Sequence, residues 1–149
     1  MYDLFVSYRR ADLAVVEPVV RSLEALGLRV WFDRSAISDF APITAGIRRG
    51  LADSRALLAW YSKAYPESRP CQMEFIAAWV AAEGLGSLAD RILIVNPESA
   101  CEHFISAAAR DLEHLQVAAE DTPTQIAERI ARHVRDRLGS ASALGASIA

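Results

Sequence analysis

Short, continuously apolar runs alternate along this chain with segments whose apolar residues recur at helical spacing, and this alternation limits the fold more than any other feature. Strands that are apolar at every position, rather than at every second one, are typical of a sheet buried on both faces. The expected strands cover residues 2–8, 28–33, 55–62, 91–96 and, at one edge, 112–117. Because helical segments separate them, the pattern predicts a parallel sheet with helices on both sides.

The segments between the strands predict the helices. The expected helices run from Pro18 to Gly27, from Pro42 through Leu51, over 71–82, over 101–110 and from just after Thr122 to Gly139. The last helix has the clearest start, because Thr122, Pro123 and Gln125 match the pattern of a capping box. Residues 1–138 are therefore expected to form one α/β domain, and the small-residue tail 139–149 is expected to be a flexible linker.

The position of a ligand site follows from this architecture. Five strands in a chain of 149 residues favour a flavodoxin-like parallel sheet with strand order 2-1-3-4-5, whose ligand crevice lies at the carboxyl ends of strands 1 and 3. Tyr8, Arg9 and Arg10 leave strand 1 at that edge, and Cys71 and Glu74 open the helix that follows strand 3. These residues are expected to meet in the crevice.

Composition excludes several classes of protein. The net charge of −3 and the pI near 5.6 do not fit a nucleic-acid-binding domain, which usually carries a basic face. Cys71 and Cys101 are far apart and form no metal-ligand spacing, so neither a metal site nor a disulfide framework is expected. The longest apolar run, residues 75–82, is too short for a membrane span, and the N-terminus lacks the pattern of a signal peptide. A cytoplasmic location is expected.

Glu74 is the residue that fits a purely structural role least well. At 100° per residue, Gln72 and Glu83 mark a stripe that faces water, whereas Glu74 lies on the opposite side of the helix among small apolar residues. A glutamate in a first helical turn is favoured by the helix dipole alone. A partly buried carboxylate, however, must be paired or must serve a function. The sequence leaves both interpretations open.

The other polar residues of the crevice are also ambiguous. Arg9 and Arg10 are either solvated charges or ligands for phosphate or carboxylate groups. No glycine-rich turn follows strand 1, so a classical dinucleotide fingerprint is absent. Cys71 is interpreted as a small buried residue rather than a thiolate nucleophile, and Ser7 has no base near it that would form a hydrolase triad. A phospho-acceptor receiver is disfavoured, since strand 1 offers only Asp3, at the wrong end.

Taken in order, these motifs resemble those of the TIR (Toll/interleukin-1 receptor) family. Its first signature resembles YDLFVSYRR at residues 2–10. The second and third segments of bacterial TIR domains are similar to LRVWFDR and to ITAGIRRGLADSRALLAWYSKAYPESRPCQMEF, which contains the Cys-x-x-Glu element that opens the following helix. The resemblance covers residues 1 to about 138 and implies the same flavodoxin-like fold.

The resemblance also implies two candidate functions. Some TIR domains cleave NAD at the nicotinamide–ribose bond, and some of these cyclise the product, whereas others are adaptors that only bind further TIR domains. In the enzymatic branch the glutamate of the Cys-x-x-Glu element is catalytic, and it matches Glu74. Tyr8, Arg9, Arg10 and Cys71 are expected to contact the substrate. The chain is thus expected to be an NAD nucleosidase or cyclase, with NAD as substrate and no further cofactor or metal, or else a non-catalytic scaffold.

The loop over residues 33–42 is expected to close the site and to contact a neighbouring protomer. Asp33, Phe40 and Ile43 are expected to contact the substrate. Two positions depart from the family pattern: Pro70 stands where a tryptophan is usual, and Ala41-Pro42 replaces Pro-Gly. The resemblance further implies an effector module of a bacterial defence or signalling protein. Such a module self-associates and works with a fused or partner sensor domain, without direct contact to nucleic acid or membrane.

Overall fold

The computed structural model describes residues 1–32, 45–104, 107–139 and 143–145. Its centre is a five-stranded, all-parallel sheet with the order β2-β1-β3-β4-β5. The strands are β1 (Tyr2–Tyr8), β2 (Val30–Trp31), β3 (Ser54–Trp60), β4 (Ile92–Asn96) and β5 (His114–Gln116). The predicted fold class and strand order are confirmed.

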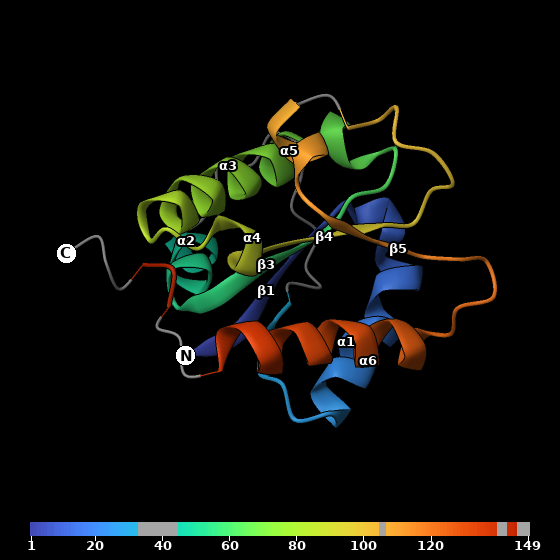
Figure 1. Ribbon diagram of the computed structural model, residues 1–149, viewed down its shortest axis with the longest axis horizontal. Coiled ribbons are helices and arrows are strands. Elements are labelled where there is room, and N and C mark those ends of the chain that lie inside the picture. The colour runs from blue at the N-terminus through green and yellow to red at the C-terminus, as the bar shows by residue number, and fades with distance from the viewer. Residues whose placement is uncertain (33–44, 105–106, 140–142, 146–149) are drawn as a thin grey trace.

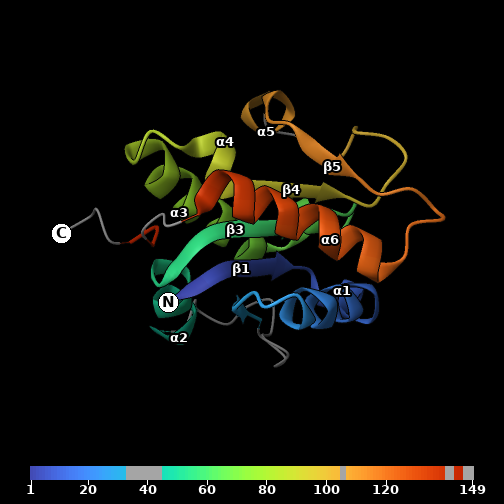
Figure 2. The same cartoon turned by 60° about the horizontal axis from the view of Figure 1, so that its bottom comes forward.

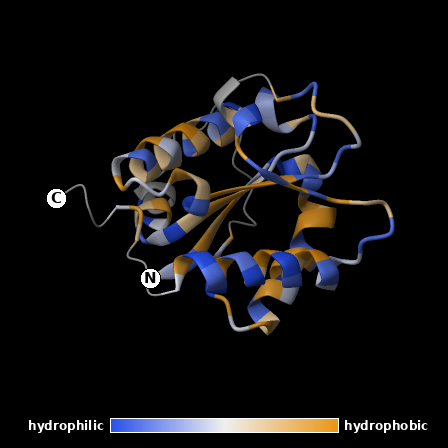
Figure 3. Ribbon diagram, viewed as in Figure 1, coloured by the Kyte–Doolittle hydropathy of each residue, from blue (hydrophilic) through white to orange (hydrophobic). Residues whose placement is uncertain are grey.

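Helices cover both faces of this sheet (Figures 1 and 2). One face packs against α1 (Leu13–Ala25) and α6 (Pro123–His133), and the other against α2 (Ala45–Ala52) and α3 (Arg69–Gly84). The shorter helices are η1 (Arg10–Asp12), η2 (Tyr65–Glu67), α4 (Leu88–Arg91), α5 (Ala107–Asp111) and the π-helical η3 (Val134–Leu138). Figure 3 shows the apolar strands enclosed between helices whose outer sides are more polar.

Two apolar layers result, because successive side chains of a strand point to opposite faces. Leu4 and Val6 of β1 belong to the layer under α1 and α6, whereas Phe5 belongs to the layer under α3. Ser7 follows Phe5 on the α3 face and is also buried. The sheet alternation thus decides which residues at the end of β1 can face α3.

The pairing of β1 with β3 brings the two carboxyl ends together. The register runs from Tyr2 opposite Ser54 to Tyr8 opposite Trp60, so both strands end at the same edge. The chain leaving β3 forms η2 and then α3, which starts above this edge. The predicted meeting place of strands 1 and 3 is therefore correct.

The start of α1 differs from the prediction. The helix begins at Leu13, and Pro18 lies inside it rather than in its first turn. Proline inside a helix removes one backbone hydrogen bond, but the buried stripe begins before it. The residues of this stripe are Val16, Val19, Val20 and Leu23. Burial of the stripe against α6 outweighs the local cost of the proline.

Three other elements are shorter than expected. β2 covers Val30–Trp31 and starts later than the expected residue 28, because the backbone N–H of Leu28 still bonds the Leu23 carbonyl at the end of α1; residue 33 of the expected strand lies outside the described residues. The expected helix over 101–110 is replaced by a turn, in which the Phe104 N–H bonds the Cys101 carbonyl, and by α5. The expected edge strand over 112–117 narrows to β5.

The C-terminal tail departs from the expected linker at residues 143–145. The backbone N–H of Leu144 donates to the Ser54 carbonyl at 2.7 Å, and that of Gly145 donates to the Ala52 carbonyl at 3.0 Å. The Leu144 side chain is 1% exposed and joins the apolar layer on the α3 face. The tail completes the core here, although its composition of small residues resembles that of a linker.

Candidate functional site

The candidate site lies where the carboxyl ends of β1 and β3 meet the start of α3. Ser68 caps α3, because its side chain accepts a hydrogen bond from the Cys71 N–H at 3.4 Å. Pro70 stands in the first turn, where a missing N–H costs little. These local signals place the first turns of α3, and therefore Cys71 and Glu74, directly above the strand ends.

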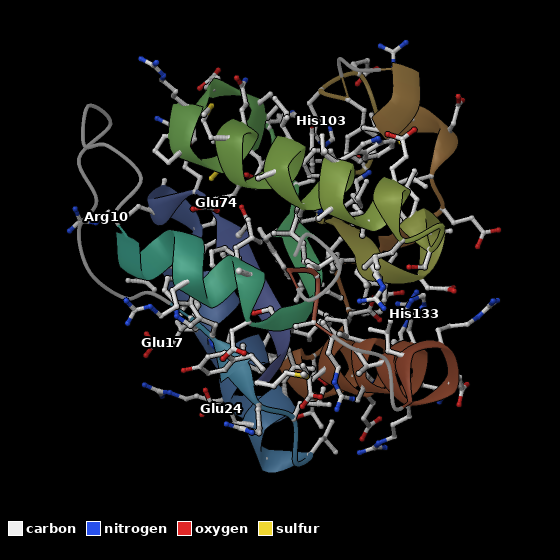
Figure 4. All side chains as sticks on the ribbon, turned by 90° about the vertical axis from the view of Figure 1, so that its left-hand side faces the viewer. Arg10, Glu17, Glu24, Glu74, His103 and His133 are labelled. Atoms are coloured by element: carbon white, nitrogen blue, oxygen red, sulfur yellow. The ribbon has the colours of Figure 1, made fainter. Side chains whose placement is uncertain are left out.

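Glu74 points inward, as the helical periodicity predicts. Its side chain is 8% exposed, whereas Gln72 and Glu83 on the other side of α3 are exposed. Figure 4 shows Glu74 beneath α3, on the side of β1 and α2. The buried stripe of the helix consists of Cys71, Glu74, Ala78 and Ala82. Ala77, which the helical wheel places among the small apolar residues near Glu74, is exposed in the structure.

Tyr65 is a site residue that the sequence analysis missed. It is 1% exposed, and its hydroxyl lies 2.8 Å from the Ser7 Oγ and donates to the Cys71 carbonyl oxygen at 3.3 Å. The hydroxyl thereby joins β1, η2 and α3 at the strand ends. The alternation of side chains along β1 places Ser7 on the face of Glu74, and this signal was available from the sequence. No local pattern indicates that Tyr65 is its partner.

Burial controls the protonation of the groups next to Glu74. Desolvation raises the pKa of the Cys71 thiol to about 12; the hydrogen bond from Ser68 opposes this rise, and the Glu74 charge adds to it. Desolvation likewise raises the pKa of Tyr65 well above its usual value, and the nearby Cys71 and Glu74 contribute. Both groups stay protonated at neutral pH. Cys71 is therefore not an activated nucleophile, despite its place in the first turns of a helix.

Tyr8 is not brought together with Glu74. Its ring lies 4.9 Å from the ring of Phe32 and packs against the apolar layer under α1 and α6, on the opposite face of the sheet. The remaining expected substrate contacts, Asp33, Phe40 and Ile43, lie outside the described residues, as does the loop over 33–42.

The two arginines after β1 differ in their surroundings. The Arg9 Nη1 donates to the Ala64 carbonyl at 3.2 Å and lies 3.7 Å from a carboxylate oxygen of Glu67. Although desolvation dominates the pKa of the Cys71 thiol, the charge of Arg9 lowers that pKa. Arg10 is exposed at the start of η1 and forms no ion pair with any described residue. Figure 4 shows Arg10 at the outer edge of the region that contains Glu74.

Trp31 borders the site region from β2. Its ring stacks on Phe5 with a centroid distance of 4.5 Å and an interplanar angle of 5°. The close approach of α2 depends on Gly50, since a Cβ at that position would meet the Trp31 indole at 2.5 Å. A glycine that weakens a helix locally is thus required for packing here.

Other features of the described ranges lie away from this region. A groove of about 650 Å³ between α6 and the β4–β5 edge, and one of about 690 Å³ beside α1 and α6, do not include Glu74 in their linings. Within these ranges no group of three or more potential ligands could hold a metal ion, and no helix is long and apolar enough to cross a bilayer. The candidate site is therefore defined by the burial of Glu74 and by the hydrogen bonds of the Tyr65 hydroxyl.

Comparison with known families assigns the chain. A family model described as TIR domain matches residues 4–131, well over half of the sequence. The chain belongs to the TIR domain family. No protein in the search of curated sequences matches this TIR domain.

The solved structures that share the fold of this TIR domain include two from other proteins. One is the TIR domain of the Toll-related receptor TRR-2 from Hydra magnipapillata, with 15% sequence identity, a TM-score of 0.65, and coverage of 91% of this chain and 99% of that one. The other comprises the TIR domains of the activated Roq1 resistosome, which recognises the pathogen effector XopQ, with 16% identity, a TM-score of 0.67, and coverage of 89% and 98%. At this identity the likeness concerns the fold alone.

The shared hydroxyl of Tyr65 makes a testable contribution to stability. We expect Tyr65→Phe and Ser7→Ala each to lower the free energy of unfolding by about 1–3 kcal/mol, because each breaks the buried hydrogen bond between these two hydroxyls. The double variant should lose less than the sum of the two, since the second change removes an already broken bond. Urea unfolding measures all three variants, and Tyr2→Phe at the other end of β1 is the control. Strict additivity would contradict the assignment.

Proposed function

We propose that this TIR domain cleaves the nicotinamide–ribose bond of NAD, with Glu74 as its catalytic carboxylate. The product is ADP-ribose or a cyclic form of it. The domain would act in the cytoplasm, as the effector module of a larger defence or signalling protein with a fused or partner sensor domain. The observation that carries the proposal is a carboxylate only 8% exposed on the small-residue face of α3, at the strand ends.

The chemistry of NAD requires only one carboxylate. Most glycosidic bonds need a second carboxyl group to protonate the leaving group. Nicotinamide in NAD is already cationic and leaves as a neutral ring, so no such acid is needed. The ribose left behind resembles an oxocarbenium ion, whose positive charge is stabilised by a fixed anion in a dry site. Glu74 would supply this anion.

The neighbours of Glu74 suit this role. Tyr65 and Cys71 are kept neutral by burial, so neither competes with Glu74 as a negative charge. The interaction of a carboxylate with a developing cation is stronger where water is excluded. A cation formed on the ribose would therefore be stabilised mainly by Glu74.

Glu74→Gln tests the catalytic role. The substitution keeps the shape of the side chain and removes its charge, so we expect a folded protein that binds NAD but has a kcat lower by at least about a hundredfold. Nicotinamide release, followed by chromatography, measures the rate, and circular dichroism checks the fold. Glu83→Gln, on the exposed side of the same helix, is the matched control and should keep the wild-type rate. A wild-type rate in Glu74→Gln would refute the assignment.

Arg10 is the stronger candidate for binding the phosphates of NAD. It is exposed and forms no ion pair within the described residues, whereas Arg9 is already engaged by Ala64 and Glu67. A charge-assisted hydrogen bond to phosphate gains more from an arginine that has no competing carboxylate. Arg9 would then act mainly by holding the segment between β3 and α3.

Alanine substitutions separate the two arginines. We expect Arg10→Ala to raise the KM for NAD about ten- to a hundredfold, which corresponds to losing a charge-assisted bond of roughly 1.5–3 kcal/mol, without lowering the melting temperature. Unlike Arg10→Ala, Arg9→Ala should also lower the melting temperature of the protein, because the Ala64 carbonyl loses the hydrogen bond that Arg9 donates to it. Steady-state kinetics and thermal unfolding provide the two measurements, with Arg21→Ala on α1 as control. If KM stays at the wild-type value in both variants, the arginines are only solvated charges.

A second candidate function, that of a TIR–TIR scaffold, is favoured by one surface of α3. Met73, Ile76 and Val80 are 48%, 59% and 62% exposed, and their spacing places them on one stripe of the helix. Exposed apolar stripes of this kind mark contact surfaces. The TIR domains of Roq1 belong to an activated resistosome, which supports a second copy of this chain as the partner. A scaffold function and NAD cleavage are compatible if assembly completes the site.

Assembly predicts a rate that depends on protein concentration. We expect NAD turnover per molecule to rise with concentration in the wild type, together with the mass measured by light scattering. Ile76→Asp should abolish both increases, because it places a charge in the contact. Val15→Asp changes an equally exposed apolar residue of α1 and should leave both unchanged. A wild type that assembles but never releases nicotinamide would favour the scaffold alone, and a monomer with constant turnover would exclude assembly.

A further inference from the structure

A second group of reactive side chains lies at the β4–β5 edge of the sheet, outside the candidate NAD site. The Sγ of Cys101, in the connection between β4 and β5, is 3.7 Å from the Nε2 of His114 and 3.6 Å from the Nδ2 of Asn96. Cys101 is exposed, whereas Asn96 is fully buried. This connection contains α5 and leads into β5, at the opposite edge of the sheet from β2 (Figure 1).

The Asn96 amide is held in position to donate to the sulfur. It also donates to the Ala100 carbonyl and to the Gln116 Oε1, each at 3.1 Å. The amide cannot rotate away without breaking these bonds in a buried environment. The amide has two protons for these three acceptors, so the sulfur of Cys101, the most distant of them, shares one N–H of a fixed amide.

The imidazole of His114 offers a second donor. Its Nδ1 is buried and has no hydrogen-bond partner among the described residues. A buried N–H without an acceptor is costly, so the proton of the neutral ring is better placed on Nε2, which faces the sulfur. The N–H of His114 and a shared N–H of Asn96 then point to Cys101, and such donors stabilise a negative charge on sulfur.

This geometry differs from that of a hydrolytic triad. In a triad, the third residue orients the base by bonding its second ring nitrogen. Here Asn96 contacts the sulfur, and Nδ1 of His114 has no such bond within the described part of the chain. The cluster is arranged to stabilise a thiolate and not to transfer protons to a leaving group.

Space for a small reactant is present beside the thiol. A cavity of about 490 Å³ is lined by Cys101, Glu102, Phe104, Arg110 and His114. Among the described residues of this lining, the charged groups are the carboxylate of Glu102 and the guanidinium of Arg110, which also donates to the Phe104 carbonyl oxygen. A low-molecular-weight disulfide that carries both amino and carboxylate groups fits these charges.

We propose that Cys101 is a site of reversible thiol–disulfide exchange with small disulfides, with Asn96 and His114 stabilising its thiolate. The exposed thiol loses its proton to water. The electron pair of the thiolate then forms a bond to one sulfur of the small disulfide. The S–S bond of that disulfide breaks, and its electron pair stays on the other sulfur, which leaves as a thiolate and takes up a proton. The small disulfide is the oxidant, and Cys101 ends as a mixed disulfide. This site goes beyond the proposed NAD chemistry and is independent of it.

Cys71 is an internal control within the same chain. It is 3% exposed, and burial raises its pKa to about 12. Incubation of the folded protein with glutathione disulfide at pH 7 should therefore add one adduct per chain, located at Cys101 by peptide mass spectrometry. Cys101→Ser should add none, and the protein unfolded in guanidinium should label both cysteines. No adduct on the folded wild type, or an adduct at Cys71, would overturn the proposal.

Two variants of His114 separate donation from packing. His114→Gln keeps an N–H near the position of Nε2 but loses the ring, whereas His114→Phe keeps a ring that can contact Phe104 (centroid distance 5.1 Å in the wild type) but loses the donor. With 2,2′-dithiodipyridine at pH 7, we expect His114→Phe to react at least about tenfold more slowly and His114→Gln to stay within about threefold of the wild type. The reverse order would show that the ring only packs, and would overturn the role of His114.

Discussion

The pairing of β1 with β3 in the middle of the sheet is the constraint on which the rest of this structure depends. Both strands are apolar along their length and buried on both faces, so they require helices on both sides. Their parallel register ends at one edge, where Tyr8 lies opposite Trp60. The start of α3 is held above that edge by the hydroxyl of Tyr65, which contacts Ser7 and the Cys71 carbonyl. The candidate site is a consequence of this arrangement.

Burial at the start of α3 has opposite consequences for its polar groups. It favours the neutral forms of Cys71 and Tyr65, as their raised pKa values show. The same burial is unfavourable for an ionised carboxylate, and Glu74 shares the stripe with them. A helix face of small residues has no packing need for a glutamate, and this mismatch is the observation from which the proposed role of Glu74 starts.

The two cysteines of this TIR domain show how strongly position determines thiol chemistry. Cys71 lies in the first turns of a helix, a place that lowers thiol pKa values in exposed sites, but desolvation dominates and the thiol stays protonated. Cys101 lies in an irregular connection, yet it is exposed and faces the nitrogen groups of Asn96 and His114. The sequence pattern predicts burial of Cys71, but it does not indicate that Cys101 lies against these two groups.

Local geometry determined what the sequence could predict. Apolar continuity predicted the parallel sheet, and five strands in a chain of this length favoured its order. The capping box at Thr122 predicted the start of α6, and the helical period of 100° per residue predicted that Glu74 faces inward. The tertiary structure alone decided which groups meet across elements, such as Ser7 with Tyr65, 58 positions away, and how Leu144 completes the core. Helical and strand periods set the direction of a side chain, whereas its partner depends on strand register and loop path, which have no period in the sequence.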